Sequence, residues 1–237
     1  MAKVSPFQQA HNRLGAVFGE FDGWTLPSDF GDSQSEQDAI LNHCAAVDLS
    51  SFGRICLKGS HTEILLQQAD IQLPSPLSDG RWCWAVKNGD GRPGRLRIGK
   101  IGSEIIILTL PGRDKTLLAE LKQISEKMNL QNTILDVSEN TGMLGLYGPN
   151  AFRLVRQLLP FDLEDLQSEG VTRISLFMLN FVVFRGSWLD IDGLELVCPA
   201  SAGPLAAGSI AKAREKYNIT PAGMAAFREI LKQKNLL

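Results

Sequence analysis

The sequence lacks the features that mark several common classes of protein. Its 237 residues contain no apolar run of the roughly 18–20 residues that a membrane-spanning helix needs. The formal net charge is only −2, which gives no reason to expect a nucleic-acid or membrane partner. The opening residues, MAKVSPFQQAHNR, have no apolar core of a signal peptide. The sequence therefore predicts a cytoplasmic protein.

Cysteine and histidine are few and scattered. The four cysteines (Cys44, Cys56, Cys83 and Cys198) form no CxxC pair, and the three histidines lie far apart in the sequence. This pattern favours free thiols in a reducing compartment over disulfides, and it indicates no metal site. A phosphate-binding glycine loop, a dinucleotide fingerprint and a GxSxG nucleophile turn are also missing.

What remains is typical of a globular chain with a substantial core: 44% of the residues are apolar and 21% are charged. Helices are predicted over Ser35–Ala46 and Lys115–Met128. The long apolar run Ile174–Phe184 predicts one central strand, with Leu194–Cys198 as its hairpin partner. Helices and hairpins follow one another without a repeated strand–helix–strand unit. The expected fold class is therefore α+β, with antiparallel sheets and helices.

The stretch from Phe21 to Gly59 is the most informative part of the chain. It begins with a turn-rich segment that we interpret as a stiff loop, because Pro27 fixes its own φ and disfavours helix at Leu26. Trp24 lies in this loop, and a helix and a polar turn follow it. The residues alone leave two interpretations open: a well-packed loop that covers the edge of a core, or a loop that contributes to function.

Several motifs in this stretch resemble one family. GEFDGWTLPSDFG, then Glu36, then AAVDLSSFGRICLKG resemble the opening of the glycine cleavage system T protein, a folate-dependent aminomethyltransferase. LGLYGPNAFRLVRQLLP further resembles the strand, glycine-proline and helix of that family. The resemblance implies a discontinuous folate-binding first domain, residues 1–51 with 139–237, and an inserted α+β second domain, residues 52–138. Family members usually continue into a third, barrel-like domain, which we expect to be absent because the chain stops at Leu237.

The turn from Arg185 to Glu195 is the candidate site. Glu195 lies within an apolar strand, where an unpaired carboxylate would be costly, so it must point to solvent or find hydrogen-bond donors. A pterin ring offers two adjacent donors that one carboxylate can accept together. The nearby Trp188 has an indole face that could stack on such a flat heterocycle. The alternative is an ordinary edge-strand glutamate.

The resemblance implies roles for these residues. Arg185, Gly193 and Glu195 match the family pattern, whose last glutamate holds the pterin, and Trp188 stands where a pocket tyrosine would be. The predicted cofactor-binding residues are Glu195, Trp188, Arg185, Trp84 and Arg228. Trp84 comes from an aromatic-rich predicted strand, and Arg228 is displaced by one position from the family's arginine. The implied ligand is tetrahydrofolate or its 5-methyl or 5,10-methylene derivative.

The sequence departs from the family pattern at the residues that the family uses for catalysis. Aminomethyltransferases have paired aspartates after a glycine-glycine turn, whereas the comparable segment Gly91–Leu96 offers Arg95 and no aspartate. An arginine cannot relay a proton near neutral pH. Catalytic residues and enzyme status therefore stay open; an active protein would be a tetrahydrofolate-dependent methyl- or aminomethyltransferase that acts on a small donor.

The alternative is a non-catalytic subunit or assembly factor of the same fold, like the small subunit of sarcosine oxidase. A partner subunit would then stand in place of the third domain. A maintenance factor for iron–sulfur enzymes ranks last, because the lysine-glycine-cysteine-tyrosine motif of that subgroup is absent.

Overall fold

The computed structural model describes residues 2–88, 94–158, 163, 165–176, 178–205, 212, 214 and 216–236. Helices and mostly antiparallel strands alternate along this part of the chain, which confirms the α+β class. The chain divides into two compact units. Unit 1 comprises Met1–Ser50, Asn140–Ser168 and Arg173–Leu237, and unit 2 comprises Ser51–Glu139 with Glu169–Thr172. Each unit has its own sheet and core and is described separately below.

The main sheet of unit 1 has six strands, of which β12 begins within the short unit 2 segment. In spatial order they are β12 (Val171–Leu176), β13 (Leu179–Arg185), β14 (Gly193–Pro199), β11 (Thr141–Tyr147), β4 (Ala45–Asp48) and β15 (Thr220–Ala222). The pairs β13–β14, β14–β11 and β11–β4 are antiparallel, and β15 pairs with β4 in parallel. This order brings β4, near the start of the chain, beside strands from its second half.

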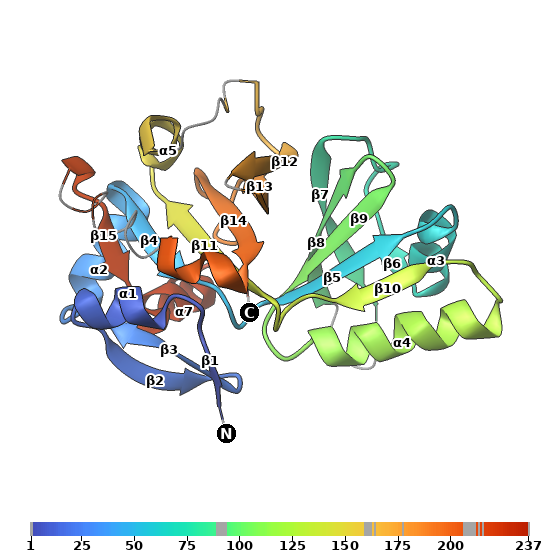
Figure 1. The fold of residues 1–237 in the computed structure, drawn as a ribbon, viewed down its shortest axis with the longest axis horizontal. Coiled ribbons are helices and arrows are strands. Elements are labelled where there is room, and N and C mark those ends of the chain that lie inside the picture. The colour runs from blue at the N-terminus through green and yellow to red at the C-terminus, as the bar shows by residue number, and fades with distance from the viewer. Residues whose placement is uncertain are drawn as a thin grey trace. The chain divides into compact units, whose positions relative to one another are not determined.

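Two helices separate this sheet from a smaller one. The smaller sheet has the order β1 (Lys3–Val4), β3 (Trp24–Asp29) and β2 (Val17–Phe21). Helices α2 (Ser33–Asn42) and α7 (Met224–Gln233) pack on each other, with α7 against β3 and both helices against β4 (Figure 1). Further helices of unit 1 whose bounds the structure describes are α1 (Gln8–Arg13), α5 (Ala151–Leu158) and the 3₁₀ turn η1 (Ala200–Ala202). Helix α5 packs on β11 and β14.

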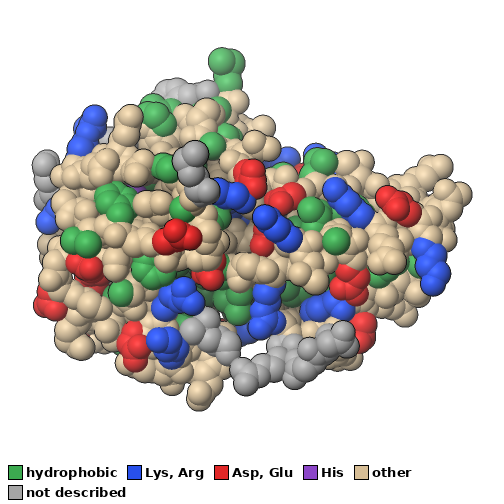
Figure 2. All heavy atoms as spheres, turned by 90° about the horizontal axis from the view of Figure 1, so that it is seen from below, with side chains coloured by type: hydrophobic (Ala, Val, Ile, Leu, Met, Phe, Trp, Pro, Cys, Tyr) green, Lys and Arg blue, Asp and Glu red, His purple; other side chains and the backbone are tan. Residues whose placement is uncertain are grey.

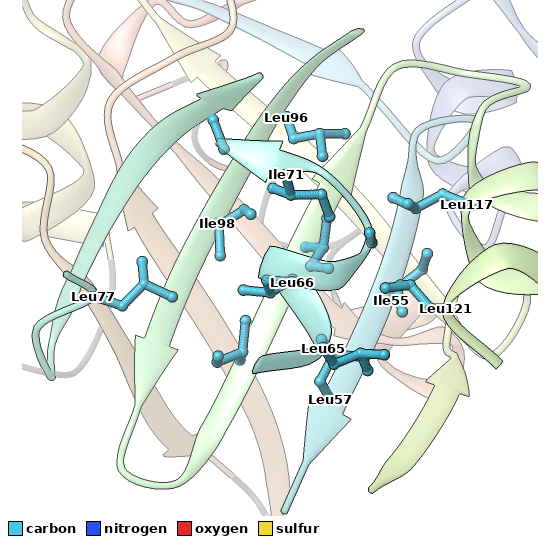
Figure 3. Packing of buried hydrophobic residues seen from close by; sticks show 14 residues of the cluster. Ile55, Leu57, Leu65, Leu66, Ile71, Leu77, Leu96, Ile98, Leu117 and Leu121 are labelled. Atoms are coloured by element: carbon cyan, nitrogen blue, oxygen red, sulfur yellow. The ribbon is translucent and has the colours of Figure 1, made fainter. Parts of the chain in front are cut away.

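Unit 2 is a fully antiparallel six-stranded sheet with two helices. Its strand order is β10 (Thr133–Asp136), β5 (Gly53–Lys58), β9 (Glu104–Thr109), β8 (Gly94–Ile101), β7 (Arg81–Lys87) and β6 (Ile71–Gln72). Helices α3 (Thr62–Gln68) and α4 (Asp114–Lys127) supply Leu65, Leu66, Leu117 and Leu121 to one core (Figure 3). Alternate strand residues such as Ile55 complete that core, because successive side chains of a strand point to opposite faces.

The prediction of a loop around Trp24 is wrong, because this segment forms the hairpin β2–β3. Asp22 and Gly23 are its two turn residues, with φ of 52° and 79°, and Phe21 pairs with Trp24. Two successive positive φ values match the right-handed twist of a hairpin, and an Asp-Gly pair adopts them readily. Pro27 is tolerated because β1 pairs with β3 only through Lys3 and Val4, so the missing N–H of Pro27 interrupts no ladder on that side.

Two predicted elements have different boundaries from those expected. The helix expected to reach Ala46 ends at Asn42, and Ala45 starts β4 because strands on both sides satisfy its backbone groups. The prediction of a single strand over Ile174–Phe184 is also wrong, because a turn at Met178, with φ of 63°, divides this segment between β12 and β13. The hairpin pairing of Leu194–Cys198 with the second of these strands is confirmed.

The described surface gives no sign of a dominant charge or a membrane span. In the face shown in Figure 2, Lys and Arg side chains are interspersed with Asp and Glu side chains. Within the described ranges, no helix is both long and apolar enough to cross a bilayer.

Candidate functional site

The segment from Gly186 to Asp192 joins β13 to β14 and folds back into unit 1. The amide of Gly186 donates to the carbonyl of Gly193 over 2.8 Å and closes the segment. Inside it, the Ser187 hydroxyl donates to the Ile191 carbonyl (2.8 Å) and accepts from the Ile191 amide (3.1 Å). Trp188, which lies within this closed segment, is buried, with an exposed fraction of only 1%.

Glu195 is the fully buried carboxylate of this site, with an exposed fraction of 0%. Its Oε1 accepts a hydrogen bond from the Tyr147 hydroxyl over 2.8 Å and another from the Trp188 amide over 3.0 Å. A buried carboxylate is tolerated only where donors replace its lost hydration. The inward fold of the Gly186–Asp192 segment supplies one of these donors, and β11 supplies the other.

Tyr147 lies on the same face of the main sheet as Glu195, and its ring is tightly packed. It pairs with Gly193 of β14, while Gly145, two residues earlier in β11, pairs with Glu195. A Cβ atom at Gly145 would overlap the Cζ and Oη atoms of Tyr147, and one at Gly193 would come within 2.9 Å of its Cδ1. Phe227 of α7 stacks on the tyrosine ring at 5.6 Å between centroids and 22° between planes. The two glycines thus make room for the ring, and α7 covers it.

The predicted site residues are distributed over both units. Glu195 and Trp188 are in contact, as described. Arg185 lies nearby in the chain, but its guanidinium donates to the Leu166 carbonyl (2.6 Å) and lies 3.8 Å above the Phe152 ring.

Arg228 and Trp84 come from other elements and have contacts of their own. Arg228, on α7, forms an ion pair with Asp22 at 3.4 Å, and its side chain is 39% exposed. Trp84 belongs to β7 of unit 2, where the guanidinium of Arg95 lies 3.5 Å from its ring centroid. Arg95 therefore forms a cation–π contact at the position where the family pattern has an aspartate. The preceding residues of that segment, 91–93, lie outside the described part.

A second buried polar cluster surrounds Asp48 at the end of β4. The Nε2 atom of His11 lies 2.8 Å from Asp48 Oδ2, the Ser5 hydroxyl donates to the same oxygen, and the Ser50 amide donates to Oδ1 over 2.9 Å. Burial alone would raise the pKa of Asp48, but His11, Ser5 and Ser50 together hold it below its ordinary value. The cluster joins the N-terminal segment to the main sheet.

Glu36, at the start of α2, joins two distant backbone segments. Its two carboxylate oxygens accept from the amides of Phe30 (2.6 Å) and Gly223 (2.7 Å). Burial raises the pKa of Glu36, and the two amides only partly offset this. Glu36 therefore fixes the beginning of α7, the helix that covers Tyr147.

The described residues give little support for metal binding or for thiol chemistry. Among them, no group of three or more His, Cys, Asp or Glu side chains lies close enough together to hold a metal ion. None of the four cysteines forms a disulfide, and burial raises the pKa of Cys44 to about 11, which keeps it protonated and unreactive at neutral pH.

Tyr147 is the site residue that sequence reasoning missed. The alternation of Gly145 and Tyr147, and of Gly193 and Glu195, places each pair on one face of its strand. That much could be seen in the sequence. The strand register sets Gly145 opposite Glu195 and Tyr147 opposite Gly193. It thereby brings together Tyr147 and Glu195, 48 positions apart, and only the structure shows this register.

Comparison with known proteins gives a consistent result. The model of the family described as "GCVT N-terminal domain" matches residues 7–235. A probable aminomethyltransferase of Aeropyrum pernix is 28% identical over 233 residues, which cover 92% of this chain and 59% of that protein. An aminomethyltransferase of Geobacillus kaustophilus is 26% identical over 234 residues, covering 95% and 62%. The chain thus spans about three fifths of the length of these curated relatives.

Two solved structures share the fold. The glycine cleavage system aminomethyltransferase T from Bartonella henselae matches with a TM-score of 0.82 and 18% identity, covering 95% of this chain and 61% of that one. A chain of the heterotetrameric sarcosine oxidase from Corynebacterium sp. U-96 matches with a TM-score of 0.57 and 17% identity, covering 90% and 95%.

Proposed function

Because this chain belongs to the GCVT N-terminal domain family, we propose that it binds tetrahydrofolate or its 5-methyl or 5,10-methylene derivative and handles a one-carbon group. The observation that carries the proposal is Glu195, a fully buried carboxylate whose Oε1 is held by Tyr147 and Trp188. A buried, organised carboxylate is costly to maintain, and such groups are concentrated at functional sites. Its acceptor chemistry complements the adjacent donors of a pterin.

The predicted site residues differ in how well they fit a pterin. Glu195 offers the acceptor, and the amide of Trp188 helps to orient it. The Trp188 ring is almost fully buried, so its role would be to form a rigid wall of the site. Arg228, half-exposed and paired with Asp22, is the guanidinium that would meet a ligand carboxylate. Bound folate would carry the one-carbon group, and the chain would bind and orient it.

Calorimetric titration of the purified chain with tetrahydrofolate and 5-methyltetrahydrofolate tests this proposal. We expect wild type to bind and Glu195→Gln to bind at least about tenfold more weakly, because the charged acceptor for the pterin donors is lost. Asp192→Asn, an exposed carboxylate in the same turn, is the matched control and should bind like wild type. Wild type that fails to bind at high micromolar ligand would refute folate binding. Equal affinity of Glu195→Gln and wild type would remove Glu195 from the site.

A second candidate function is that of a non-catalytic subunit in a larger assembly. It is favoured by the match that covers 95% of a chain of a heterotetrameric oxidase, and by Arg95, which stacks on Trp84 where the family has an aspartate. Aminomethyl transfer from a glycine-derived donor to tetrahydrofolate separates the two candidates. A folate-binding chain that does not turn over the donor would support the non-catalytic role.

A further inference from the structure

The geometry points to Tyr147 as the positioning residue of the folate site: we propose that its hydroxyl holds Oε1 of Glu195 so that the carboxylate is fixed for the pterin. This inference rests on the proposed function and assigns a role to a residue for which the sequence motifs predict none. Tyr147 and Glu195 are both fully buried, and the 2.8 Å bond between them joins β11 to β14.

The tyrosine ring has no room to move away from the carboxylate. Gly145 and Gly193 lie under it so closely that a single added carbon on either would touch the ring. Phe227 closes the opposite face by stacking. Tightly packed interiors of this kind do not deform continuously, so the hydroxyl stays where the packing places it.

This rigidity decides between two opposite roles for the hydroxyl. A mobile donor would compete with the ligand for Glu195, and its removal would strengthen binding. A fixed donor cannot leave, so it acts together with the equally fixed amide of Trp188 to hold Oε1 and to set the orientation of the whole carboxylate. Removal of a fixed donor should therefore weaken binding, because preorganisation of the acceptor is lost.

Tyr147→Phe tests the role, since phenylalanine keeps the ring and its contacts and removes only the hydroxyl. We expect the Kd for tetrahydrofolate, measured by calorimetry at pH 7, to rise about tenfold, the effect of losing one hydrogen bond to a charged group. Loss of a donor also disfavours the ionised carboxylate. On acidification, binding by the variant should therefore weaken at a higher pH than binding by wild type.

Tyr217→Phe is the matched control, because Tyr217 is the only other tyrosine of the chain. It should leave both the Kd and the pH profile unchanged. A second readout needs no ligand: in urea unfolding, the stability loss from Tyr147→Phe should be smaller in a Glu195→Gln background than in wild type. Equal losses in the two backgrounds would show that the hydroxyl does not act through Glu195, and would overturn the inference.

The outcomes separate this inference from the function on which it rests. If wild type binds no tetrahydrofolate, both fail. If wild type binds and Tyr147→Phe binds equally well or more tightly, folate binding stands and the positioning role of Tyr147 is refuted.

Discussion

At the scale of single residues, the buried polar groups of unit 1 are arranged so that each carboxylate has its own donors. Glu195 has Tyr147 and Trp188, while Glu36 has two backbone amides. Asp48 has the most complete set, since a histidine, a hydroxyl and an amide all reach it. The free energy of burying a charge makes these residues sensitive to small changes.

The first stability prediction concerns Asp48. Asp48→Asn should lower the free energy of unfolding at pH 7 by about 3 kcal/mol, because His11 loses a buried partner. The folded-state pKa of Asp48 is lowered, so its contribution is present above its unfolded value, about 3.9, and is lost as the pH falls through the folded value. The difference between wild type and variant should therefore persist from pH 7 to about pH 5 and shrink below about pH 4. Urea unfolding across this range measures it.

A surface pair provides the control for this prediction. Asp38 and His43 also form a carboxylate–imidazole pair, at 3.2 Å, but their side chains are 53% and 67% exposed. Asp38→Asn should change stability by less than about 0.5 kcal/mol, because exposed pairs contribute little. A similar loss from both variants would show that burial is not the source of the Asp48 effect.

At the scale of elements, turns with positive φ decide where strands begin and end. The β12–β13 turn is the clearest case, because Met178 is 100% exposed and adopts φ of 63°. This left-handed conformation costs an L-residue with a Cβ about 1–2 kcal/mol relative to glycine. The side chain of Met178, fully exposed to solvent, offers little packing to offset that cost.

Met178→Gly should therefore raise the free energy of unfolding by about 1 kcal/mol, the strain relieved at this turn. Met178→Ala is the control, because it removes the apolar side chain but keeps the Cβ, and it should give no such gain. Urea denaturation of the two variants beside wild type measures the difference. A gain of the same size in both would place the effect in the side chain and not in the backbone.

At the scale of the whole molecule, the two units have separate cores. The cluster around Ile55, Leu65 and Leu121 is built from residues of unit 2 alone, whereas the clusters around Val183 and Leu144 belong to unit 1. Separate cores allow each unit to open with its own free energy, as local unfolding does in other proteins.

Leu121→Ala should open unit 2 preferentially. Its side chain is fully buried, so truncation should destabilise this unit by about 2–5 kcal/mol. Native-state hydrogen exchange should then show faster exchange in β5 and β9 than in wild type, with a smaller change in β11 and β14. Gln123→Ala, at an exposed position of the same helix, should leave both patterns unchanged. Equal acceleration in the two units would mean that the protein opens as one cooperative body.

The sequence by itself determined the fold class, the main apolar elements and the family. Helix α4 begins and ends within one residue of its prediction, because apolar residues at helical spacing are a local signal. The resemblance also identified Glu195 as the candidate acceptor. Where prediction failed, as at the Asp22–Gly23 turn and at Met178, the backbone conformation depended on pairing with neighbouring strands.

Only the tertiary structure decided which groups meet Glu195. Tyr147 lies 48 residues away in the chain, and it reaches the carboxylate because β11 and β14 pair in a register that sets Gly193 opposite Tyr147. Propensity and periodicity act within an element, whereas register is fixed by the packing of many side chains from distant elements. For that reason the sequence was enough to identify Glu195 as the candidate acceptor, whereas only the folded structure shows that Tyr147 donates to it.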